Sequence, residues 1–125
     1  MILLLDAHAL LWWLADDPTM SRSGRAAIED PANDVIVSAA SVWEIEIKRA
    51  LGELTAPDGL VDAVHAASLG TVPITAADAE HAGRLPPHHR DPFDRMLVAQ
   101  ALRLGAVIVS RDADFAPYGI QLLPI

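Results

Sequence analysis

Short apolar runs alternate with longer amphipathic segments along this chain. The runs Ile2–Leu5, Val35–Val37 and Val107–Val109 are continuously apolar, which is typical of strands buried on both faces of a parallel sheet. Leu122–Leu123 predicts a weaker last strand. The apolar pattern therefore predicts a sheet whose strands are far apart in the sequence.

Amphipathic segments with helical spacing lie between these strands, and Pro- or Gly-containing turns separate them. The predicted helices are His8–Ala15, Ser23–Glu29, Val42–Leu51, Gly59–Ser68, Ala76–Gly83 and Pro92–Leu104. Strands spaced by helices predict an α/β fold with a central, mostly parallel sheet and helices on both faces. The 125 residues contain no internal repeat or linker, so we expect one domain over residues 1–125.

Composition limits the class of protein. Hydrophobic residues make up 52% of the chain, which predicts a packed core. The absence of cysteine excludes disulfides and thiolate zinc sites and agrees with a cytoplasmic location. The apolar start ends at Asp6, too early for a signal peptide, and no apolar run approaches the roughly 20 residues needed to span a bilayer. We therefore expect no membrane association.

Four carboxylates are candidates for a common site. Asp6 directly follows the first predicted strand, and Asp112 follows Val107–Val109 after two residues. Carboxyl ends of parallel strands share one edge of the sheet, where ligands bind. Glu44 is expected in the first turn of a helix that starts from this edge. Asp94 is expected in the first turn of a helix that precedes a strand, so its placement is less direct.

Glu44 and Asp94 also have a purely structural interpretation. Ser41 and Glu44 match a capping box. Asp91, Pro92 and Asp94 match a helix N-cap, a proline at the first helical position and an acid that offsets the helix dipole. Each acid taken alone is more often structural. Asp94, however, heads an apolar helix stripe and is expected to face the protein interior.

Converging carboxylates require compensation. Two of them about 4 Å apart repel by roughly 4 kcal/mol at an effective dielectric constant of about 20. Protonation or a divalent cation must relieve this repulsion among four acids. Ligands that are all oxygen favour Mg²⁺ or Mn²⁺ over zinc. Such ions activate water and neutralise the charge of a phosphate.

The net charge of −8 argues against nucleic-acid binding through a generally basic surface. An acidic protein that acts on nucleic acid needs bound cations or local basic groups. Four arginines could contact phosphates, although each singly is more often a solvated surface charge; they are Arg49, Arg90, Arg95 and Arg111. Lys48, one turn after Glu44, predicts an i,i+4 ion pair.

Taken together, these motifs resemble those of PIN-domain ribonucleases, specifically the VapC-type toxins of toxin–antitoxin pairs. The matching segments are Leu4–Asp6 with His8, Ser41–Ile45, Asp91–Arg95 with Ala99–Ala101, Ser110–Asp112 with Phe115, and the last strand after Tyr118–Gly119. They follow the expected order across nearly the whole chain. That order and spacing are specific, whereas no single segment is diagnostic.

The resemblance implies a PIN-like nuclease domain that cleaves RNA with metal-activated water. The residues that would hold one or two Mg²⁺ or Mn²⁺ ions are Asp6, Glu44, Asp94 and Asp112. Ser110 stands where the family often has a hydroxyl near the metal. Asp114 competes with Asp112 for the fourth position, and Asp112 is preferred as the third residue of the Ser-Arg-Asp match. The resemblance also implies a cognate antitoxin protein and a homodimer.

Two other functions fit parts of the pattern. A receiver-like phosphoacceptor domain also places acids above a parallel sheet, but its expected lysine is missing because Arg111 follows Ser110, and it leaves Glu44 unexplained. A catalytically silent PIN-fold binding module is the second alternative, and the presence of all four acids speaks against it. The adjacent His88 and His89, in a Pro-flanked loop, are expected to face RNA rather than converge on one ion.

Overall fold

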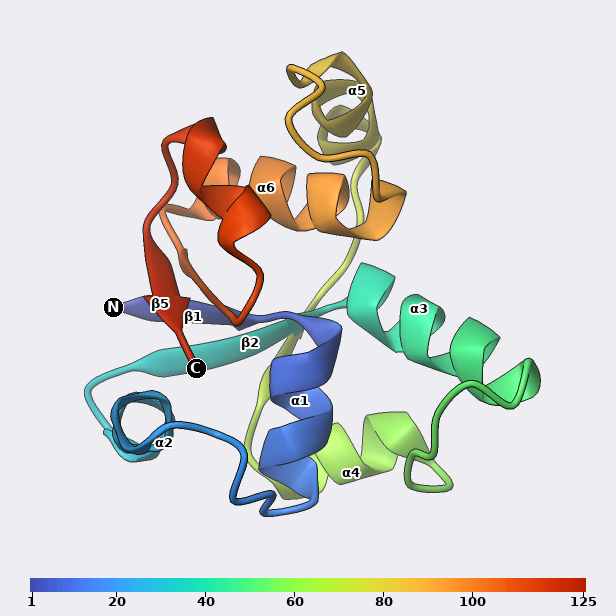
Figure 1. The fold of residues 1–125 in the computed structure, drawn as a ribbon, viewed down its shortest axis with the longest axis vertical. Helices are drawn as coiled ribbons and strands as arrows, with labels where there is room; N and C mark the ends of the chain where they lie inside the picture. The colour runs from blue at the N-terminus through green and yellow to red at the C-terminus, as the bar shows by residue number, and fades with distance from the viewer.

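A computed structural model describes residues 1–125. Its core is a five-stranded, all-parallel sheet with the strand order β3-β2-β1-β4-β5 (Figure 1). The strands are β1 (Ile2–Leu5), β2 (Asp34–Ser38), β3 (Gly70–Val72), β4 (Val107–Ser110) and β5 (Leu122–Pro124). The predicted α/β fold with a parallel sheet is confirmed.

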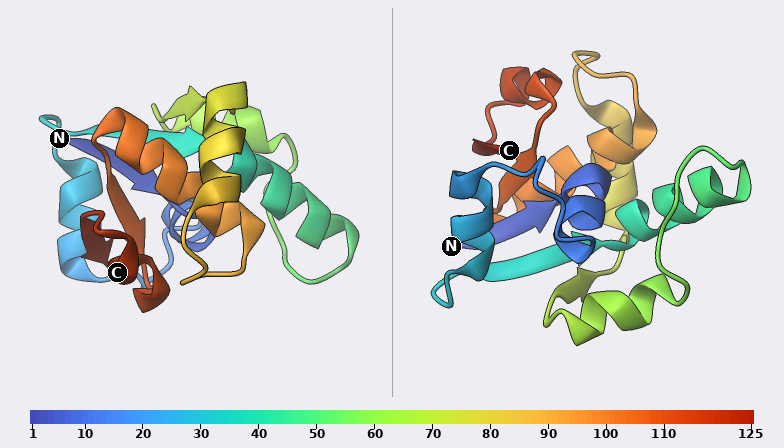
Figure 2. Two further views of the ribbon diagram at one scale, coloured as in Figure 1. Left: turned by 90° about the horizontal axis from the view of Figure 1, so that it is seen from above. Right: turned by 60° about the horizontal axis from the view of Figure 1, so that its bottom comes forward.

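Helices cover both faces of the sheet, as predicted. They are α1 (Ala7–Leu14), α2 (Arg22–Glu29), α3 (Ala39–Ala50), α4 (Leu60–Ala66), α5 (Ala76–Arg84), α6 (Pro92–Leu104) and the 3₁₀ helix η1 (Ala113–Tyr118). Alternate residues of β1 face opposite sides: Leu3 and Leu5 pack in a core with α1, α2 and α4, whereas Leu4 packs with α6 and η1. Helix α5 lies against α6 (Figure 2, left). None of these helices is both long and apolar enough to cross a membrane.

The direction in which successive strands are added to the sheet reverses at β1. The chain passes from β1 to β2 and β3, then returns through α5 and α6 to β4 on the other side of β1. Open parallel sheets bind ligands at such a switch point, beyond the carboxyl ends of the strands. Because Leu5 of β1 pairs with Val109 of β4, the next residues, Asp6 and Ser110, lie side by side at the carboxyl ends of the two strands. Receiver domains have the strand order 2-1-3-4-5, so the structure does not support the receiver-like alternative.

Two elements differ from the sequence-based prediction in kind. Strand β3 was not predicted, because it is a three-residue edge strand that begins with Gly70 and carries no continuous apolar run. The 3₁₀ helix η1 was not predicted either, since Pro117 lies inside it. Both elements lie outside the apolar centre of the sheet, where the sequence pattern is weakest.

The start of α3 also differs, and this changes the interpretation of Glu44. The helix begins at Ala39, and its N-cap is Ser38, whose hydroxyl accepts a hydrogen bond from the backbone N–H of Ala40 at 3.0 Å. The predicted capping box between Ser41 and Glu44 is therefore wrong. Glu44 lies in the second helical turn, and its carboxylate is not engaged in capping.

Candidate active site at the sheet edge

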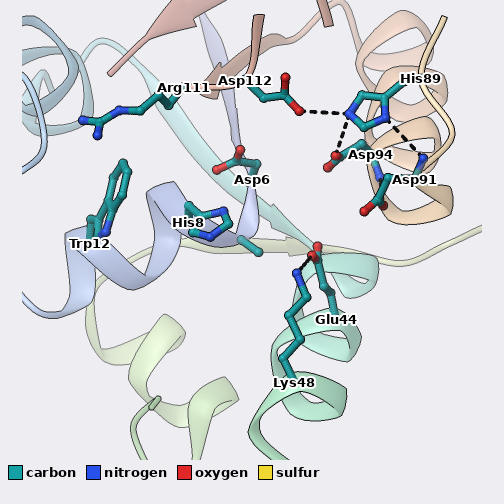
Figure 3. Close-up of a pocket in the computed structure, with 11 residues that line it drawn as sticks. Asp6, His8, Trp12, Glu44, Lys48, His89, Asp91, Asp94, Arg111 and Asp112 are labelled. Carbon is teal, nitrogen blue, oxygen red and sulfur yellow. Dashed lines mark hydrogen bonds and ion pairs between the residues drawn. The ribbon is translucent and has the colours of Figure 1, made fainter. Parts of the chain in front are cut away.

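A pocket of about 520 Å³ opens at the switch point between β1 and β4. Five acids line it, namely Asp6, Glu44, Asp91, Asp94 and Asp112, together with the basic side chains of His8, Lys48, His89 and Arg111. Figure 3 shows these side chains around Asp6. The structure thus brings all four sequence-predicted acids into one pocket, although they come from four different elements.

Asp6 is held by hydrogen bonds to both of its carboxylate oxygens. It follows β1 and caps α1: its Oδ1 accepts a hydrogen bond from the backbone N–H of Ala9 at 2.8 Å. Its Oδ2 accepts a hydrogen bond from the hydroxyl of Ser110 at the end of β4. The residue is only 6% exposed. Burial raises the pKa of Asp6 above its ordinary value, and the two hydrogen bonds only partly oppose that rise.

Glu44 reaches the pocket from α3. Its carboxylate is buried, and Lys48, one turn later, donates to Oε2 over 2.7 Å. This confirms the predicted i,i+4 ion pair (Figure 3). The hydrogen bond with Glu44 raises the pKa of Lys48, so the ammonium group stays charged. Lys48 therefore fixes the orientation of Glu44 and offsets part of its charge.

Asp94 lies in the first turn of α6, whose N-cap is Asp91 as predicted. Oδ1 of Asp91 accepts from the backbone N–H groups of Phe93 and Asp94, at 2.8 and 3.1 Å. Burial, with the charge of Asp91 adding to it, raises the pKa of Asp94 to about 7. An acid with this pKa is only partly ionised at neutral pH. The pocket therefore favours an added positive charge.

His89 supplies such a charge when its ring is protonated, and sequence analysis did not include it in the site. Its Nε2 lies 2.9 Å from Oδ2 of Asp94 and 2.9 Å from Oδ2 of Asp112. Burial disfavours the imidazolium form, but the hydrogen bond to Asp112 and the charges of Asp94, Asp112 and Asp91 outweigh it, so the pKa of His89 is raised. The ring thus bridges two of the predicted metal ligands.

Long-range contacts hold His89 in place. Arg95 donates to the backbone carbonyls of Leu85, Pro86 and His89, at 2.8, 3.1 and 3.2 Å. The hydroxyl of Tyr118 accepts from the backbone N–H of His89 at 2.8 Å. Arg95 is therefore committed to this loop and is not available as a phosphate contact. His88 packs against Tyr118 instead of entering the pocket, so the two histidines do not converge.

Asp112 and Asp114 occupy different places. Asp112 caps η1, where its Oδ1 accepts from the backbone N–H of Asp114 at 2.9 Å, while Oδ2 faces His89. Although burial opposes it, these hydrogen bonds hold the pKa of Asp112 below its ordinary value. Asp114 is exposed and does not line the pocket. It does lie close enough to share an ion with His89 and Asp112, because their ligand atoms lie within 4.8 Å of one another.

The donor atoms of this pocket fit a hard divalent cation. Its acids offer carboxylate oxygens, the ligands that Mg²⁺ and Mn²⁺ prefer. Burial and mutual repulsion raise the pKa of Asp6 and of Asp94, and a bound cation relieves both effects. The four acids are held by strand ends, helix caps and an ion pair. Binding of one ion by all four acids requires His89 to move, because its ring lies between Asp94 and Asp112, and the ligand atoms that already lie within 4.8 Å of one another are those of His89, Asp112 and Asp114.

Comparison with known proteins identifies relatives over most of the chain. The family model described as PIN domain matches residues 3–120. Ribonuclease VapC22 of Mycobacterium tuberculosis is 31% identical over an alignment of 116 residues, and the match covers 87% of this chain and 85% of that protein. Two solved structures have a similar fold. One is VapBC2 from Rickettsia felis, in complex with a DNA fragment of its promoter. It has a TM-score of 0.72 at 15% identity, and the match covers 100% of this chain and 99% of that chain. DNA-bound VapBC from Salmonella typhimurium has a TM-score of 0.71 at 16% identity, over 99% and 98% of the two chains.

Proposed function

Because this chain belongs to the PIN-domain family and is of the VapC type, we propose that it is a Mg²⁺- or Mn²⁺-dependent endoribonuclease, the toxin of a toxin–antitoxin pair. One observation carries the proposal: four acids from separate elements converge at the switch point, in a pocket that favours added positive charge. They are Asp6, Glu44, Asp94 and Asp112. RNA as the substrate is supported by the relative that is named a ribonuclease.

In this mechanism the four acids would hold the metal ion. A bound divalent cation lowers the pKa of a coordinated water and offsets negative charge on the phosphate. Ser110 and the N–H of Ala9 fix the two oxygens of Asp6, so that this acid keeps one orientation. Lys48 does the same for Glu44. When protonated, His89 balances part of the charge of Asp94 and Asp112, between which its ring lies.

The test is cleavage of single-stranded RNA by the purified protein with Mg²⁺, with Mn²⁺ and with a chelator. We expect Asp6→Asn and Asp94→Asn each to lower kcat by about 100-fold or more, as for removal of one charge-stabilising group from an active site. Asp58→Asn is the control, because this aspartate is fully exposed and outside the pocket. Metal-independent cleavage, or unchanged cleavage by the two site variants, would contradict the proposal.

A matched pair of variants tests the fourth ligand. Asp112 lines the pocket and Asp114 does not, yet both lie near His89. If Asp112 is the ligand, Asp112→Asn raises the Mn²⁺ concentration needed for half-maximal activity, and Asp114→Asn leaves it close to that of the wild type. The reverse order would assign the position to Asp114.

We propose a protein antitoxin and a homodimer as partners of this chain. The antitoxin is supported by the solved complexes of similar fold, which are named as toxin–antitoxin complexes or VapBC pairs. Expression of the chain alone should arrest growth, the Asp6→Asn variant should not, and the product of an adjacent antitoxin gene should relieve the arrest. Arrest that persists with Asp6→Asn would exclude RNA cleavage as its cause.

The homodimer has a candidate surface beside the edge strand β3. Trp43 is 60% exposed and Val61 is 44% exposed, and both line an apolar groove of about 540 Å³. Exposed apolar patches of this kind often mark protein interfaces. Light scattering should give twice the chain mass of 13.4 kDa, and Trp43→Lys should shift the mass toward the monomer. A monomeric wild-type protein would contradict this proposal.

A further inference from the structure

Arg111 occupies one wall of the pocket and is held there by contacts from distant parts of the chain. Its guanidinium carbon lies 4.5 Å from the centroid of the Trp12 ring, within range of a cation–π interaction. Its Nε donates to the backbone oxygen of Ile125, and one terminal nitrogen donates to that of Thr19, both at 3.0 Å. In Figure 3, Arg111 and Trp12 lie on one side of Asp6, and His89 lies on the other. The guanidinium is therefore fixed over Trp12, at the end of the pocket opposite His89.

Arg111 forms no ion pair with a side-chain carboxylate, although its charge interacts with that of Asp17 nearby. Among the basic groups that line the pocket, Lys48 pairs with Glu44, and His89 lies between Asp94 and Asp112. Arg111 donates only to backbone oxygens and forms no ion pair with any aspartate or glutamate. Its guanidinium thus keeps N–H groups beyond those used in these two hydrogen bonds, and an incoming anion can accept from them.

The other arginines that the sequence offered for phosphate binding are committed or lie elsewhere. Arg49 pairs with Glu46 and Asp58, and Arg95 donates to the carbonyls of the loop that carries His89. Arg90 does not line the pocket. Arg111 alone among the four lines the pocket, and it forms no ion pair with a side-chain carboxylate.

We propose that Arg111, seated on Trp12, binds the phosphate of a single-stranded RNA that neighbours the scissile phosphate. This inference rests on the proposed function. A guanidinium binds phosphate oxygens through paired hydrogen bonds, and one already fixed on an aromatic ring loses little freedom on binding. The pocket is rich in acids and the chain carries a net charge of −8, so a fixed cation is needed to bring the strand in. A single strand can bend so that adjacent phosphates reach Arg111 and the acids.

The test compares Arg111→Met and Arg111→Lys with Arg84→Met, which removes the same charge from a side chain that is 76% exposed on α5 and outside the pocket. kcat and KM are measured on a single-stranded RNA that the wild type cuts, at several salt concentrations. We expect Arg111→Met to raise KM roughly tenfold, from loss of hydrogen bonds to a charged group, with little change in kcat. The slope of log kcat/KM against log salt should shrink by about 0.7, the value for one phosphate contact on a single strand. Arg111→Lys should retain the slope.

A second measurement locates the phosphate, and its wild-type part does not depend on folding of the variant. Neutral methylphosphonate groups replace single phosphates around the cut site. One substitution next to the scissile phosphate should raise KM for the wild type and for Arg84→Met, and should have no further effect on Arg111→Met.

The outcomes separate the two proposals. If the wild type cleaves RNA but no methylphosphonate position beside the cut raises KM, the role of Arg111 is excluded and the nuclease proposal stands. An Arg111→Met protein with the KM and salt slope of Arg84→Met excludes it equally. If the wild type cleaves no RNA with either metal, the proposed function fails, and the role of Arg111 fails with it.

Discussion

The hydroxyl of Ser110 donates a hydrogen bond to Oδ2 of Asp6, which joins the carboxyl ends of β4 and β1 at the switch point of the sheet. The same hydroxyl accepts a hydrogen bond from the backbone N–H of Asp112 at 2.9 Å. Ser110 therefore links the positions of two candidate metal ligands, one from each strand. No other side chain can replace this hydrogen bond, since Ser110 is the only side chain that donates to Asp6.

Replacing Ser110 with alanine should weaken metal binding without unfolding the protein. The hydrogen bond from Ser110 lowers the pKa of Asp6, so its removal lets burial raise that pKa further and disfavours the ionised ligand. Loss of a group that orients a metal ligand typically costs about 10–100-fold in affinity or activity, and we expect that range for Ser110→Ala. The measurement is RNA cleavage against Mn²⁺ concentration. Ser110→Thr keeps the hydroxyl and serves as the control; equal half-saturation in both variants would contradict the role of this hydrogen bond.

Asp94→Asn should stabilise the metal-free protein at high pH while it abolishes activity. The pKa of Asp94 is about 7 in the folded protein, because of burial and the charge of Asp91, against 3.8 as its ordinary value. Between these values the folded protein binds a proton that the unfolded chain has released, so stability falls as pH rises through this range. Because asparagine does not ionise, the Asp94→Asn variant should not lose this part of its stability as pH rises.

Urea unfolding with a chelator, at pH 4 and pH 8, measures the effect of Asp94→Asn. At pH 8 we expect the free energy of unfolding of the variant to exceed that of the wild type by on the order of 1 kcal/mol or more, since each unit of pKa shift corresponds to about 1.4 kcal/mol. At pH 4 the gain should be much smaller, because Asp94 is then protonated. Added Mn²⁺ should raise the unfolding midpoint of the wild type more than that of the variant. A gain that is the same at both pH values would show that ionisation is not its cause.

The buried strands and the acids that follow them could be predicted from the sequence for one physical reason. Strands β1 and β4 are covered on both faces, so their residues are continuously apolar, and Asp6 and Asp112 stand out where each run ends. Strand β3 pairs on one side only and is largely exposed, so selection for apolar residues is weak there. For α3, both Ser38 and Ser41 fit an N-cap in sequence. The structure uses Ser38, at which β2 ends.

His89 could not be predicted as a site residue, because its position depends on contacts between distant segments. Tyr118, which binds the backbone N–H of His89, lies 29 residues later, and Arg95 fixes the loop through carbonyls that carry no sequence signal. The only local indication was that His89 stands two residues before the cap Asp91. Asp94 was placed correctly toward the interior by its helix stripe. Its neighbours in the pocket became clear only from the packing of α6 beside α3.

Arg103→Met should destabilise the fold without affecting the pocket. Nε and a terminal nitrogen of Arg103 on α6 bind the two carboxylate oxygens of Asp78 on α5, at 2.7 and 2.9 Å, and Asp78 is only 2% exposed. This hydrogen bond is the main reason why the pKa of Asp78 lies far below its ordinary value. Without Arg103, Asp78 would be a buried charge lacking its partner.

The pH dependence identifies the cause of this destabilisation. A lowered pKa stabilises the folded state fully above the ordinary value of 3.8, and the contribution is lost as pH falls toward the lowered pKa. The thermal midpoint of Arg103→Met should therefore lie several degrees below that of the wild type at pH 7, with a narrower gap near pH 3. The control is Arg84→Met, which breaks the exposed pair with Glu80 at 3.5 Å and should change little. A gap independent of pH would point to lost packing of the side chain instead.

Gly24→Ala should have opposite effects on stability depending on residue 125. A Cβ at Gly24, inside α2, would lie 2.5 Å from Cγ2 of Ile125, which is buried in the same core. Alanine favours a helix by about 1 kcal/mol over glycine, but such a clash costs about 1–3 kcal/mol. Gly24→Ala should therefore destabilise the wild type. In an Ile125→Ala background, which lacks Cγ2, the same change should be neutral or stabilising. A double-mutant cycle by urea unfolding measures this coupling.

The clash at Gly24 should also affect Arg111, because Arg111 donates a hydrogen bond to the backbone oxygen of Ile125. Gly24→Ala should therefore raise KM for RNA by displacing Ile125. An unchanged KM in a variant that shows the expected destabilisation would mean that Arg111 does not depend on this contact.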